Sequence, residues 1–408
     1  MTGTEGQRKL WSGSFILAIL TQFFIATVFY LLVTTMALYA VEQFSAAESA
    51  AGLASSIFVL GALAARIFAG KYLDFIGRRK LLLISLVAYV IAGALYIPAD
   101  SLGLLMGIRL VHGMAFGAAS TAVSASVVGL IPLRRRAEGM GYFGISATLA
   151  AAIGPFLALL LADTVGYTAL FAVSTGASAA ALVLALLLRL PERVPSEREQ
   201  QEKWRMRLTD VLDPAALPIA LVMFLAGVAY SSVMSFLSTY ATSLDLVAAG
   251  SIFFLVYAAA VLISRLFIGR IHDRRTDNTV VYPILAVFAV GLLVLGLAQD
   301  TWALLAAAVL IGIGFGGLMP SGQTIAVTNA PEHRIGIATS TFFLMLDAGC
   351  GLGPLLLGLL IPLTGYHGMY LLMAGLAVVT MGLYFLLHGR HRGRRSRLVA
   401  PDQDTAPA

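Results

Sequence analysis

Charged side chains are scarce in this chain of 408 residues. Asp, Glu, Lys and Arg together make up 12% of it, whereas hydrophobic residues make up 59% and the mean hydropathy is +0.89. A soluble domain carries about 25% charged residues, so this chain lacks the polar surface that would keep it in water. The composition excludes a soluble globular protein and indicates an integral membrane protein.

Cysteine is nearly absent as well, because Cys350 is the only one. A single cysteine excludes an internal disulfide, and no grouping of Cys and His has the spacing of a metal site. The Gly-rich stretch 312–317 lacks a following Lys-Ser/Thr, so it is not a phosphate-binding loop. The apolar segments also offer no nucleophile–base pair. We therefore expect no metal, no cofactor and no enzymatic activity.

Long apolar runs are what the chain does contain. A helix needs about 20 residues to cross a bilayer, and twelve runs come close to or exceed this length. They cover roughly 14–40, 49–70, 80–98, 102–130, 141–162, 166–189, 214–241, 247–269, 279–299, 302–328, 336–362 and 366–388. The sequence thus predicts an all-α membrane protein with twelve transmembrane helices.

Basic residues are confined to alternate connections between these runs. Of the 27 Lys and Arg, 24 lie at the N-terminus, in every second loop, in the central segment or in the tail. By the positive-inside rule, both termini are expected to be cytoplasmic, in the plasma membrane (the inner membrane of a bacterium). The excess of basic charge is therefore an orientation signal, and no nucleic-acid partner is expected.

The chain also repeats itself at an offset of 199 residues. The matched residues include Gly70, Asp74, Pro132, Arg135 and Gly154-Pro155, which align with Gly269, Asp273, Pro331, Arg334 and Gly353-Pro354. Chance does not place Pro, Arg and Asp repeatedly in one register. Parallel repeats within a membrane are typical of transporters.

This repeat sets the expected domain organisation. Two pseudo-symmetric six-helix bundles are predicted at 1–189 and 214–388. The polar segment 190–213 is expected to be a cytoplasmic linker with an amphipathic helical part near Trp204. The tail, 389–408, is charged and ends in Pro-Ala, so we expect it to be cytoplasmic and disordered.

The loop after the second predicted span carries a recognisable pattern, G-K-Y-L-D-F-I-G-R-R-K, over residues 70–80. It resembles the signature loop of the major facilitator superfamily, G-x-x-x-D-(R/K)-x-G-R-(R/K), except for Phe75. The second copy keeps Gly269 and Asp273 but has Thr276 instead of the second glycine. This resemblance covers nearly the whole chain and implies two bundles that rock around a central cavity.

The same loop has a physical interpretation. Its glycines permit close packing and a tight turn, and Asp74 can accept hydrogen bonds from Arg78 or from N–H groups at a helix start. The resemblance implies a gating set, which consists of Gly70, Asp74, Gly77, Arg78, Arg79 and Asp273. A topological anchor without gating is the alternative.

Asp347 is the one acidic residue deep in a predicted span, and its counterpart in the first copy is Thr148. At 1.5 Å per residue it lies roughly 20 Å beyond Arg334, near the middle of the bilayer. A carboxylate that changes protonation as water access alternates is what proton coupling requires. The alternatives are a cation site and an Asp hydrogen-bonded to neighbouring hydroxyls.

Three basic residues lie within predicted spans. Arg109 lies one turn from His112, and a charge inside the bilayer costs about 2.5–3.5 kcal/mol, which suggests a function. The segment R-L-V-H-G-M-A-F-G-A resembles a motif of proton-coupled family members and implies a role in proton transfer. Packing is the alternative for both residues. Arg66 and Arg265 each lie one turn before a motif glycine, so we expect them to snorkel and to be structural, and contact with the substrate is the alternative.

Two Gly-Pro pairs, Gly154-Pro155 and Gly353-Pro354, are candidate hinges. Proline removes a helical hydrogen bond, and glycine lets a neighbouring helix come close. The first pair partly matches the family's antiporter motif, which implies export in exchange for protons.

The family fold also implies a substrate cavity lined by polar and aromatic residues. The candidates are Gln22, Tyr30, Thr34, Tyr230, Ser235, Tyr257 and Gln323. Few charges and many aromatic rings favour amphiphilic, apolar or cationic substrates.

Taken together, the resemblance implies a secondary active transporter that exports small organic molecules, drug-like or metabolite, by proton antiport with alternating access. Its partners would be the substrate, protons and the lipid bilayer, and we expect a monomer. One alternative is an exporter dedicated to an opine-type metallophore, because the sequence around Asp347 resembles that branch. The others are a proton-coupled uptake symporter and a non-transporting membrane sensor or scaffold.

Overall fold

The computed structural model describes residues 10–46, 48–201, 203 and 207–390, and within these ranges it contains helices and no strands. The predicted helical part near Trp204 and the tail beyond residue 390 lie outside this description. The first half consists of α1 (Gly13–Phe44), α2 (Glu48–Ile76), α3 (Arg78–Leu95), α4 (Leu102–Val127), α5 (Arg136–Thr164) and α6 (Tyr167–Leu187). Two short helices follow in the linker, α7 (Glu197–Gln201) and α8 (Leu208–Val211). The second half consists of α9 (Leu217–Ser243), α10 (Val247–Arg274), α11 (Asp277–Gly296), α12 (Thr301–Asn329) and α13 (Ile335–Tyr384).

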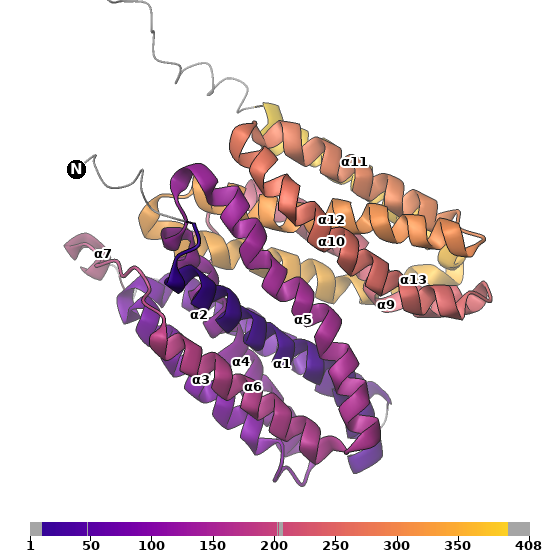
Figure 1. Cartoon of the computed structure of the whole chain (residues 1–408), viewed down its shortest axis with the longest axis horizontal. Helices are drawn as coiled ribbons and strands as arrows, with labels where there is room; N and C mark the ends of the chain where they lie inside the picture. The colour runs from indigo at the N-terminus through magenta and orange to yellow at the C-terminus, as the bar shows by residue number, and fades with distance from the viewer. Residues whose placement is uncertain (1–9, 47, 202, 204–206, 391–408) are drawn as a thin grey trace, which may run out of the picture.

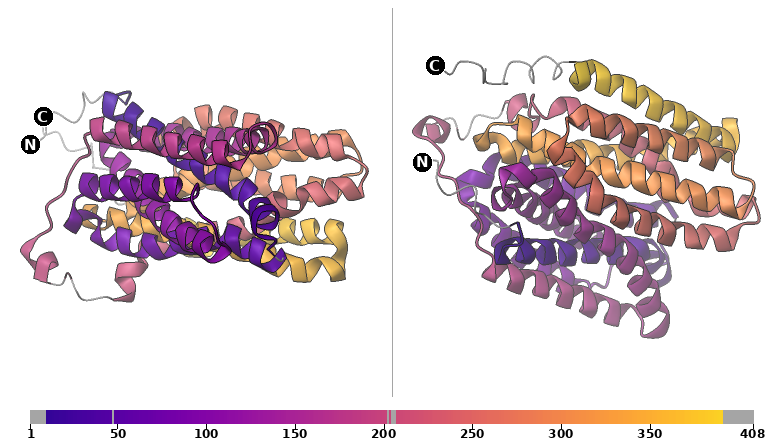
Figure 2. Two further views of the ribbon diagram at one scale, coloured as in Figure 1. Left: turned by 90° about the horizontal axis from the view of Figure 1, so that it is seen from below. Right: turned by 45° about the horizontal axis from the view of Figure 1, so that its top comes forward.

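Each half buries its own apolar side chains. One cluster of buried residues is built almost entirely from α1 to α6, and a second is built from α9 to α13. Figure 1 shows the first half, in indigo to magenta, beside the second half, in orange to yellow. Figure 2 shows from two further sides that the helices of both halves run along the long axis of the molecule. The architecture is a pair of helical bundles.

Eleven helical segments of the described residues are long and apolar enough to cross a membrane. The predicted span 80–98 is not among them. It forms α3, which is 18 residues long and begins with the basic residues Arg78, Arg79 and Lys80. Twelve crossings therefore remain a prediction, as does the cytoplasmic placement of the termini.

The break between the last two predicted spans is present in α13. Gly365 has a φ of 65° inside this element, so two helices meet there at a kink. A positive φ is strained for residues other than glycine, which explains why a glycine stands where the chain turns.

The starts of two helices depend on residues far away in the sequence. Ser12 caps α1 and Asp300 caps α12 from the adjacent position, as local sequence predicts. By contrast, α3 receives its cap from Glu192 in the linker, and α5 receives its cap from Asp273 in the other half. These two caps tie the linker and the second half to the first.

The halves contact each other mainly through two helix pairs, α2 with α13 and α5 with α10. Both pairs extend to the end of the molecule that carries the loop of residues 76–78, which we call the motif end. An exact repeat would make these two pairs equivalent, because α2 corresponds to α10 and α5 to the first part of α13.

Candidate functional site

An ion pair joins the two halves within the membrane-spanning segments. Arg66 on α2 donates from Nε to Oδ2 of Asp347 on α13, and 2.9 Å separate the two atoms. The Arg66 side chain is 4% exposed, whereas the Asp347 side chain is 27% exposed. The guanidinium is therefore enclosed, while the carboxylate keeps an open face that water can reach.

Arg66 has further partners from both halves. Its Nη1 lies 3.3 Å from the hydroxyl oxygens of Ser120 and Thr121 on α4. Its guanidinium also lies over the ring of Phe343, 4.9 Å from the ring centre. The expectation that Arg66 snorkels to the interface is wrong, because its side chain is buried among these groups.

Arg265 on α10 is the repeat counterpart of Arg66, and it is 3% exposed, so the snorkelling expectation is wrong here too. Its Nε and Nη1 atoms are buried and have no hydrogen-bond partner among the described residues. The guanidinium reaches across to α5, since a Cβ added at Gly144 would lie 2.5 Å from Nη1. A buried guanidinium offers five donors, and unmade hydrogen bonds are costly there.

Three of the predicted cavity residues are tyrosines that lie around these charges. Tyr30 on α1 is within electrostatic range of Tyr257, Asp347 and Arg265. Tyr230 on α9 stacks on Tyr257, with 5.7 Å between ring centres. We call these five residues the central cluster. It takes side chains from both halves and combines two opposite charges with aromatic surface.

The other predicted cavity residues fall into two groups. Gln22 Oε1 and Gln323 Nε2 are buried without a hydrogen-bond partner among the described residues. The hydroxyl of Thr34 donates to the carbonyl of Tyr30 in its own helix, at 2.7 Å, and Ser235 is exposed. One polar atom of each amide is therefore unpaired within the described residues, whereas Thr34 already has a backbone partner.

Arg109 and His112 lie in a different place, inside the first half. Arg109 donates from Nε to the carbonyl of Ala54 at 2.9 Å, and its guanidinium lies 4.7 Å from the centre of the Phe58 ring. His112 Nδ1 lies 3.0 Å from the hydroxyl of Tyr96. The structure thus does not bring these two residues to Asp347, and their part in proton coupling stays a prediction.

The predicted gating loop forms a tight turn between α2 and α3. Gly77 has a φ of 96°, a conformation that favours glycine, and it lets α3 begin directly after α2. Asp74 accepts a hydrogen bond from Nε of Arg78 at 2.7 Å, which is one of the two arrangements expected from the sequence.

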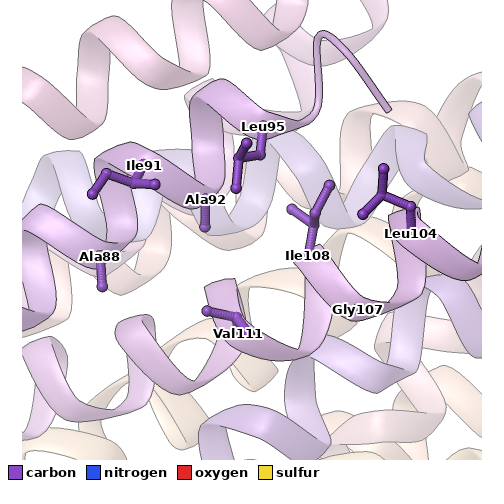
Figure 3. Close-up of a pocket in the computed structure, with 8 residues that line it drawn as sticks. All are labelled: Ala88, Ile91, Ala92, Leu95, Leu104, Gly107, Ile108 and Val111. Carbon is purple, nitrogen blue, oxygen red and sulfur yellow. The ribbon is translucent and has the colours of Figure 1, made fainter. Parts of the chain in front are cut away.

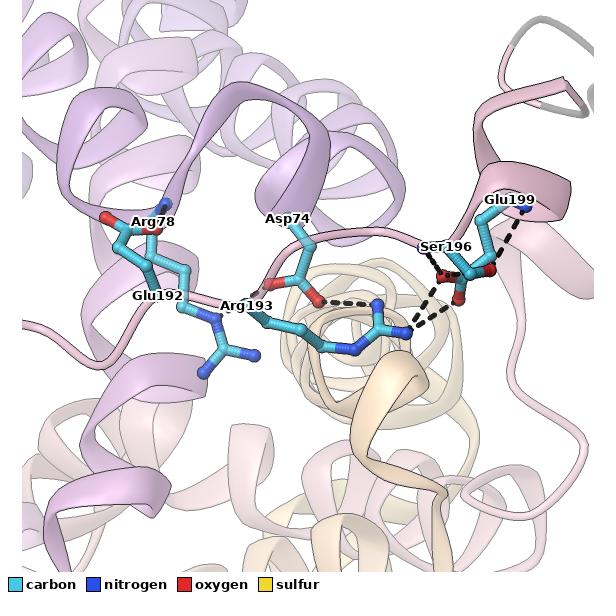
Figure 4. A network of polar contacts seen from close by, with 6 residues as sticks. All are labelled: Asp74, Arg78, Glu192, Arg193, Ser196 and Glu199. Atoms are coloured by element: carbon cyan, nitrogen blue, oxygen red, sulfur yellow. Dashed lines mark hydrogen bonds and ion pairs between the residues drawn. The ribbon is translucent and has the colours of Figure 1, made fainter.

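The linker completes this loop, as Figure 4 shows. Glu192 accepts hydrogen bonds from the backbone N–H groups of Arg78 and Arg79, both at 2.8 Å, and so caps α3. Arg193 lies 3.5 Å from the second oxygen of Asp74 and also pairs with Glu199. The loop and the linker form one charged network.

The second copy of the motif realises the other expected arrangement. Asp273 accepts hydrogen bonds from the backbone N–H groups of Ala137 at 2.7 Å and Glu138 at 2.8 Å. A carboxylate at a helix N-terminus is favoured by the helix dipole. Glu138 in turn pairs with Arg270 at 2.9 Å, and Arg270 lies on α10, the helix that also carries Asp273.

Gly70 and Ser340 also pack closely at the α2–α13 contact. The motif end is therefore closed by contacts between the halves.

Two more ion pairs involve the linker. Lys71 Nζ lies 2.9 Å from Oδ2 of Asp210, and Arg334 donates to Asp213 at 2.5 Å. Burial tends to raise the pKa of the Asp210 carboxyl, but the backbone N–H of Arg207 and the Lys71 ammonium outweigh burial, and the pKa lies below its ordinary value. Asp210 is thus ionised at neutral pH and binds Lys71 as a carboxylate.

The two Gly-Pro pairs lie at matching contacts within their own halves. A Cβ added at Gly154 would lie 2.6 Å from Cβ of Tyr30, and one added at Gly353 would lie against Ser231. Pro155 and Pro354 follow inside α5 and α13. The glycines therefore let α5 approach α1 and let α13 approach α9, and the hinge role remains a prediction.

An apolar hollow of about 450 Å³ lies elsewhere, between α3 and α4. Its lining consists of Ala88, Ile91, Ala92, Leu95, Leu104, Gly107, Ile108 and Val111 (Figure 3). Several of these side chains are exposed on the outer surface of the first half, which suits contact with lipid rather than recognition of a polar substrate.

Sequence reasoning did not single out Glu138 and Glu192, which hold the gating loops in place. Glu192 caps α3 from 113 positions away, and Glu138 pairs with Arg270 across 132 positions, so neither leaves a local signal. The importance of Arg66 and Arg265 was also missed, although their burial in apolar segments and their exact repeat spacing were the available signals. In the described residues, no group of three or more Cys, His, Asp and Glu could hold a metal ion.

Comparison with known proteins places this arrangement in context. A family model described as Major Facilitator Superfamily matches residues 18–350 and 278–406. The chain is 22% identical over 354 residues to the staphylopine export protein of Staphylococcus aureus, covering 85% of this chain and 89% of that protein. It is 25% identical over 356 residues to the multidrug resistance protein MdtG of Serratia proteamaculans, covering 85% and 86%.

Two solved structures share the fold. The human organic anion transporter MFSD10 superposes with a TM-score of 0.76 at 18% identity, covering 94% of this chain and 100% of that chain. The Escherichia coli fucose:proton symporter FucP superposes with a TM-score of 0.70 at 17% identity, covering 91% and 99%.

Proposed function

The chain belongs to the major facilitator superfamily and is a multi-pass membrane transporter rather than an enzyme, and we propose that it exports small organic molecules in exchange for protons. Bacterial relatives support the inner membrane as its location. Two relatives, named for staphylopine export and for multidrug resistance, support export as the direction.

The observation that carries proton coupling is the Arg66–Asp347 ion pair. In this proposal Asp347 is the proton carrier. As a carboxylate it binds the enclosed guanidinium of Arg66 and holds α2 against α13. When a proton binds to its open face, the charge attraction is lost and the two helices can separate. Proton binding is thereby linked to the relative position of the halves.

The energetic argument follows from burial. A buried ion pair is stable only while both partners are charged, and breaking it by removing one partner costs about 3–5 kcal/mol. A change of that size exceeds the ~1.4 kcal/mol that shifts an equilibrium tenfold. Protonation of one carboxylate is therefore sufficient to change which conformation is populated.

The test is the substitution Asp347→Asn, which keeps the shape of the side chain and removes its titration. In proteoliposomes loaded with a pH-sensitive dye, wild-type protein should release protons when ethidium or staphylopine is added, and the variant should not. The control is Asp300→Asn, because Asp300 caps α12 outside the central cluster. Unchanged proton release by Asp347→Asn would remove Asp347 from the coupling mechanism.

A dedicated metallophore exporter is the second candidate, favoured by the similarity to the staphylopine export protein. The same assay separates the two, because a dedicated exporter should respond to staphylopine and not to ethidium. Uptake by symport would instead acidify the vesicle lumen together with substrate entry, so the sign of the pH change decides the direction.

A further inference from the structure

The repeat gives Arg66 and Arg265 the same place in their halves but very different surroundings. Besides the Phe116 ring, whose repeat counterpart Phe315 is retained, Arg66 is surrounded by four partner side chains, which are Asp347, Phe343, Ser120 and Thr121. The positions one repeat away from these four are Thr148, Gly144, Met319 and Pro320. The second copy has lost the carboxylate, the covering ring and both hydroxyls, yet it has kept the guanidinium.

The loss leaves hydrogen-bond donors without acceptors. Arg265 is 3% exposed, and its Nε and Nη1 have no acceptor among the described residues. Thr148 does not serve, since its hydroxyl donates to the carbonyl of Gly144 in its own helix, at 3.4 Å, and accepts no hydrogen bond from Nε or Nη1 of Arg265. An arginine stays charged in proteins, so it cannot relieve this cost by losing a proton. An acceptor from outside the chain would relieve it.

The surroundings show what kind of molecule would bring that acceptor. Tyr257 and Tyr30 lie within electrostatic range of the guanidinium, and neither carries a charge at neutral pH. Tyr257 and Tyr230 stack in series with Phe315, with 5.7 Å and 3.9 Å between successive ring centres. Aromatic faces bind apolar or planar groups, and at Gly144 no side chain stands between α5 and the guanidinium.

We propose that Arg265 recognises a carboxylate of the transported molecule, with the tyrosines of the central cluster holding its apolar part. This inference rests on the proposed transport function and gives that function a substrate class, amphiphilic organic anions or zwitterions. A planar guanidinium matches a carboxylate with two parallel N–H···O bonds, through Nε and Nη2 or through Nη1 and Nη2, so a substrate carboxylate would satisfy one of the two idle donors together with Nη2.

In this proposal the two arginines at repeat-equivalent positions have different binding partners. Arg66 holds an internal carboxylate, Asp347, and responds to protons. Arg265 holds an external carboxylate, that of the substrate. Both contacts lie at equivalent inter-half interfaces, α2–α13 and α5–α10, so proton and substrate act on the same movement from opposite sides of the molecule.

The experiment compares two ligands of nearly the same shape, indole-3-acetate and indole-3-acetamide, which differ in charge. Binding to the purified full chain in nanodiscs is measured by calorimetry or thermal stabilisation, without any transport step. Wild-type protein should bind the carboxylate at least about tenfold more tightly than the amide, as a charge-assisted hydrogen bond predicts. Arg265→Gln should abolish this preference.

A second variant introduces a carboxylate at the position where the first copy has no acidic residue. Thr148→Asp places a carboxylate at the repeat counterpart of Asp347, where it can pair with Arg265 as Asp347 pairs with Arg66. It should abolish the preference for indole-3-acetate, whereas Thr148→Asn, equal in shape but uncharged, should retain it. Restoration of the preference in Arg265→Lys would support a charge contact.

Equal binding of both ligands by wild-type protein, or absence of binding, would overturn the proposal, as would a preference that survives in Arg265→Gln. Because binding is measured without flux, the two proposals can fail separately. Carboxylate binding without proton-coupled export would refute the proposed function alone. Export of ethidium with no carboxylate preference would refute the substrate assignment alone.

Discussion

At the scale of single residues, the site depends on how each buried charge is compensated. Asp347 compensates Arg66 within the protein, and the hydroxyls of Ser120 and Thr121 complete the environment of that guanidinium. Arg265 has no such compensation from the described residues, although it is equally buried. Two arginines in repeat positions therefore have opposite chemical capacities, one satisfied and one able to accept a ligand.

The absent side chain at Gly144 gives a residue-scale prediction. Gly144→Ala would place a methyl group 2.5 Å from Nη1 of Arg265, so the flexible end of the arginine must move. We expect the affinity for indole-3-acetate to fall about tenfold, a loss of about 1.4 kcal/mol, while thermal stability changes little. Calorimetry and a melting curve on the same sample measure both quantities. A large loss of stability with unchanged affinity would contradict this account of Gly144.

At the scale of elements, the linker binds the ends of α2 and α3 at the motif end. Glu192 caps α3, Arg193 binds Asp74, and Asp210 in α8 binds Lys71 at the end of α2. A polar segment in water would not order in this way without partners, since each ordered residue loses conformational entropy. These three charged residues of the linker have specific partners on α2 and α3 of the first half.

The Lys71–Asp210 contact has a defined pH dependence. The folded-state pKa of Asp210 is lowered, so its contribution to stability is fully present above the unfolded value of about 3.9 and is lost only as pH falls through the lower folded value. Between pH 5.5 and 8 this contact should therefore be constant. Asp210→Asn should change the transport rate by a similar factor at every pH in that range.

Rates of ethidium efflux at several pH values check this prediction. Asp347→Asn provides the contrast, because it should flatten the pH profile itself. A shift in the pH midpoint caused by Asp210→Asn would show that the linker, and not the central cluster, senses protons.

At the scale of the whole molecule, the two halves are joined at the motif end and share the central cluster. The inter-half contacts there include the Asp273 cap on α5, the Arg270–Glu138 ion pair and the close packing of Gly70 against Ser340. Alternating access requires these contacts to break in another state. Their strength therefore sets the balance between conformations.

The Asp273 cap can be weakened without touching the central cluster. Asp273→Ala and Asp300→Ala both remove a helix cap, each worth about 1 kcal/mol, but only the first cap joins the two halves. Asp273→Ala should therefore speed the reaction of Cys350 with a maleimide up to about tenfold. Cys350 is suited to report this opening, because it is the only cysteine and lies within electrostatic range of Tyr30 and Asp347.

Asp300→Ala should leave this labelling rate unchanged while lowering thermal stability by a similar amount. Equal rates in both variants would mean that the Asp273 contact is a helix cap without a gating role.

The sequence by itself determined the membrane class, the helices, the duplication, the family and local contacts such as Asp74 with Arg78. These follow from composition, from periodicity and from residues only a few positions apart, all of which act through short-range physics. Only the tertiary structure decided that Asp347 pairs with Arg66 across 281 positions, and that Arg265 has no such partner in the part of the chain that the structure describes. Which helix faces meet depends on the packing of both halves at once, and the effect of burial on a charge is set by that packing.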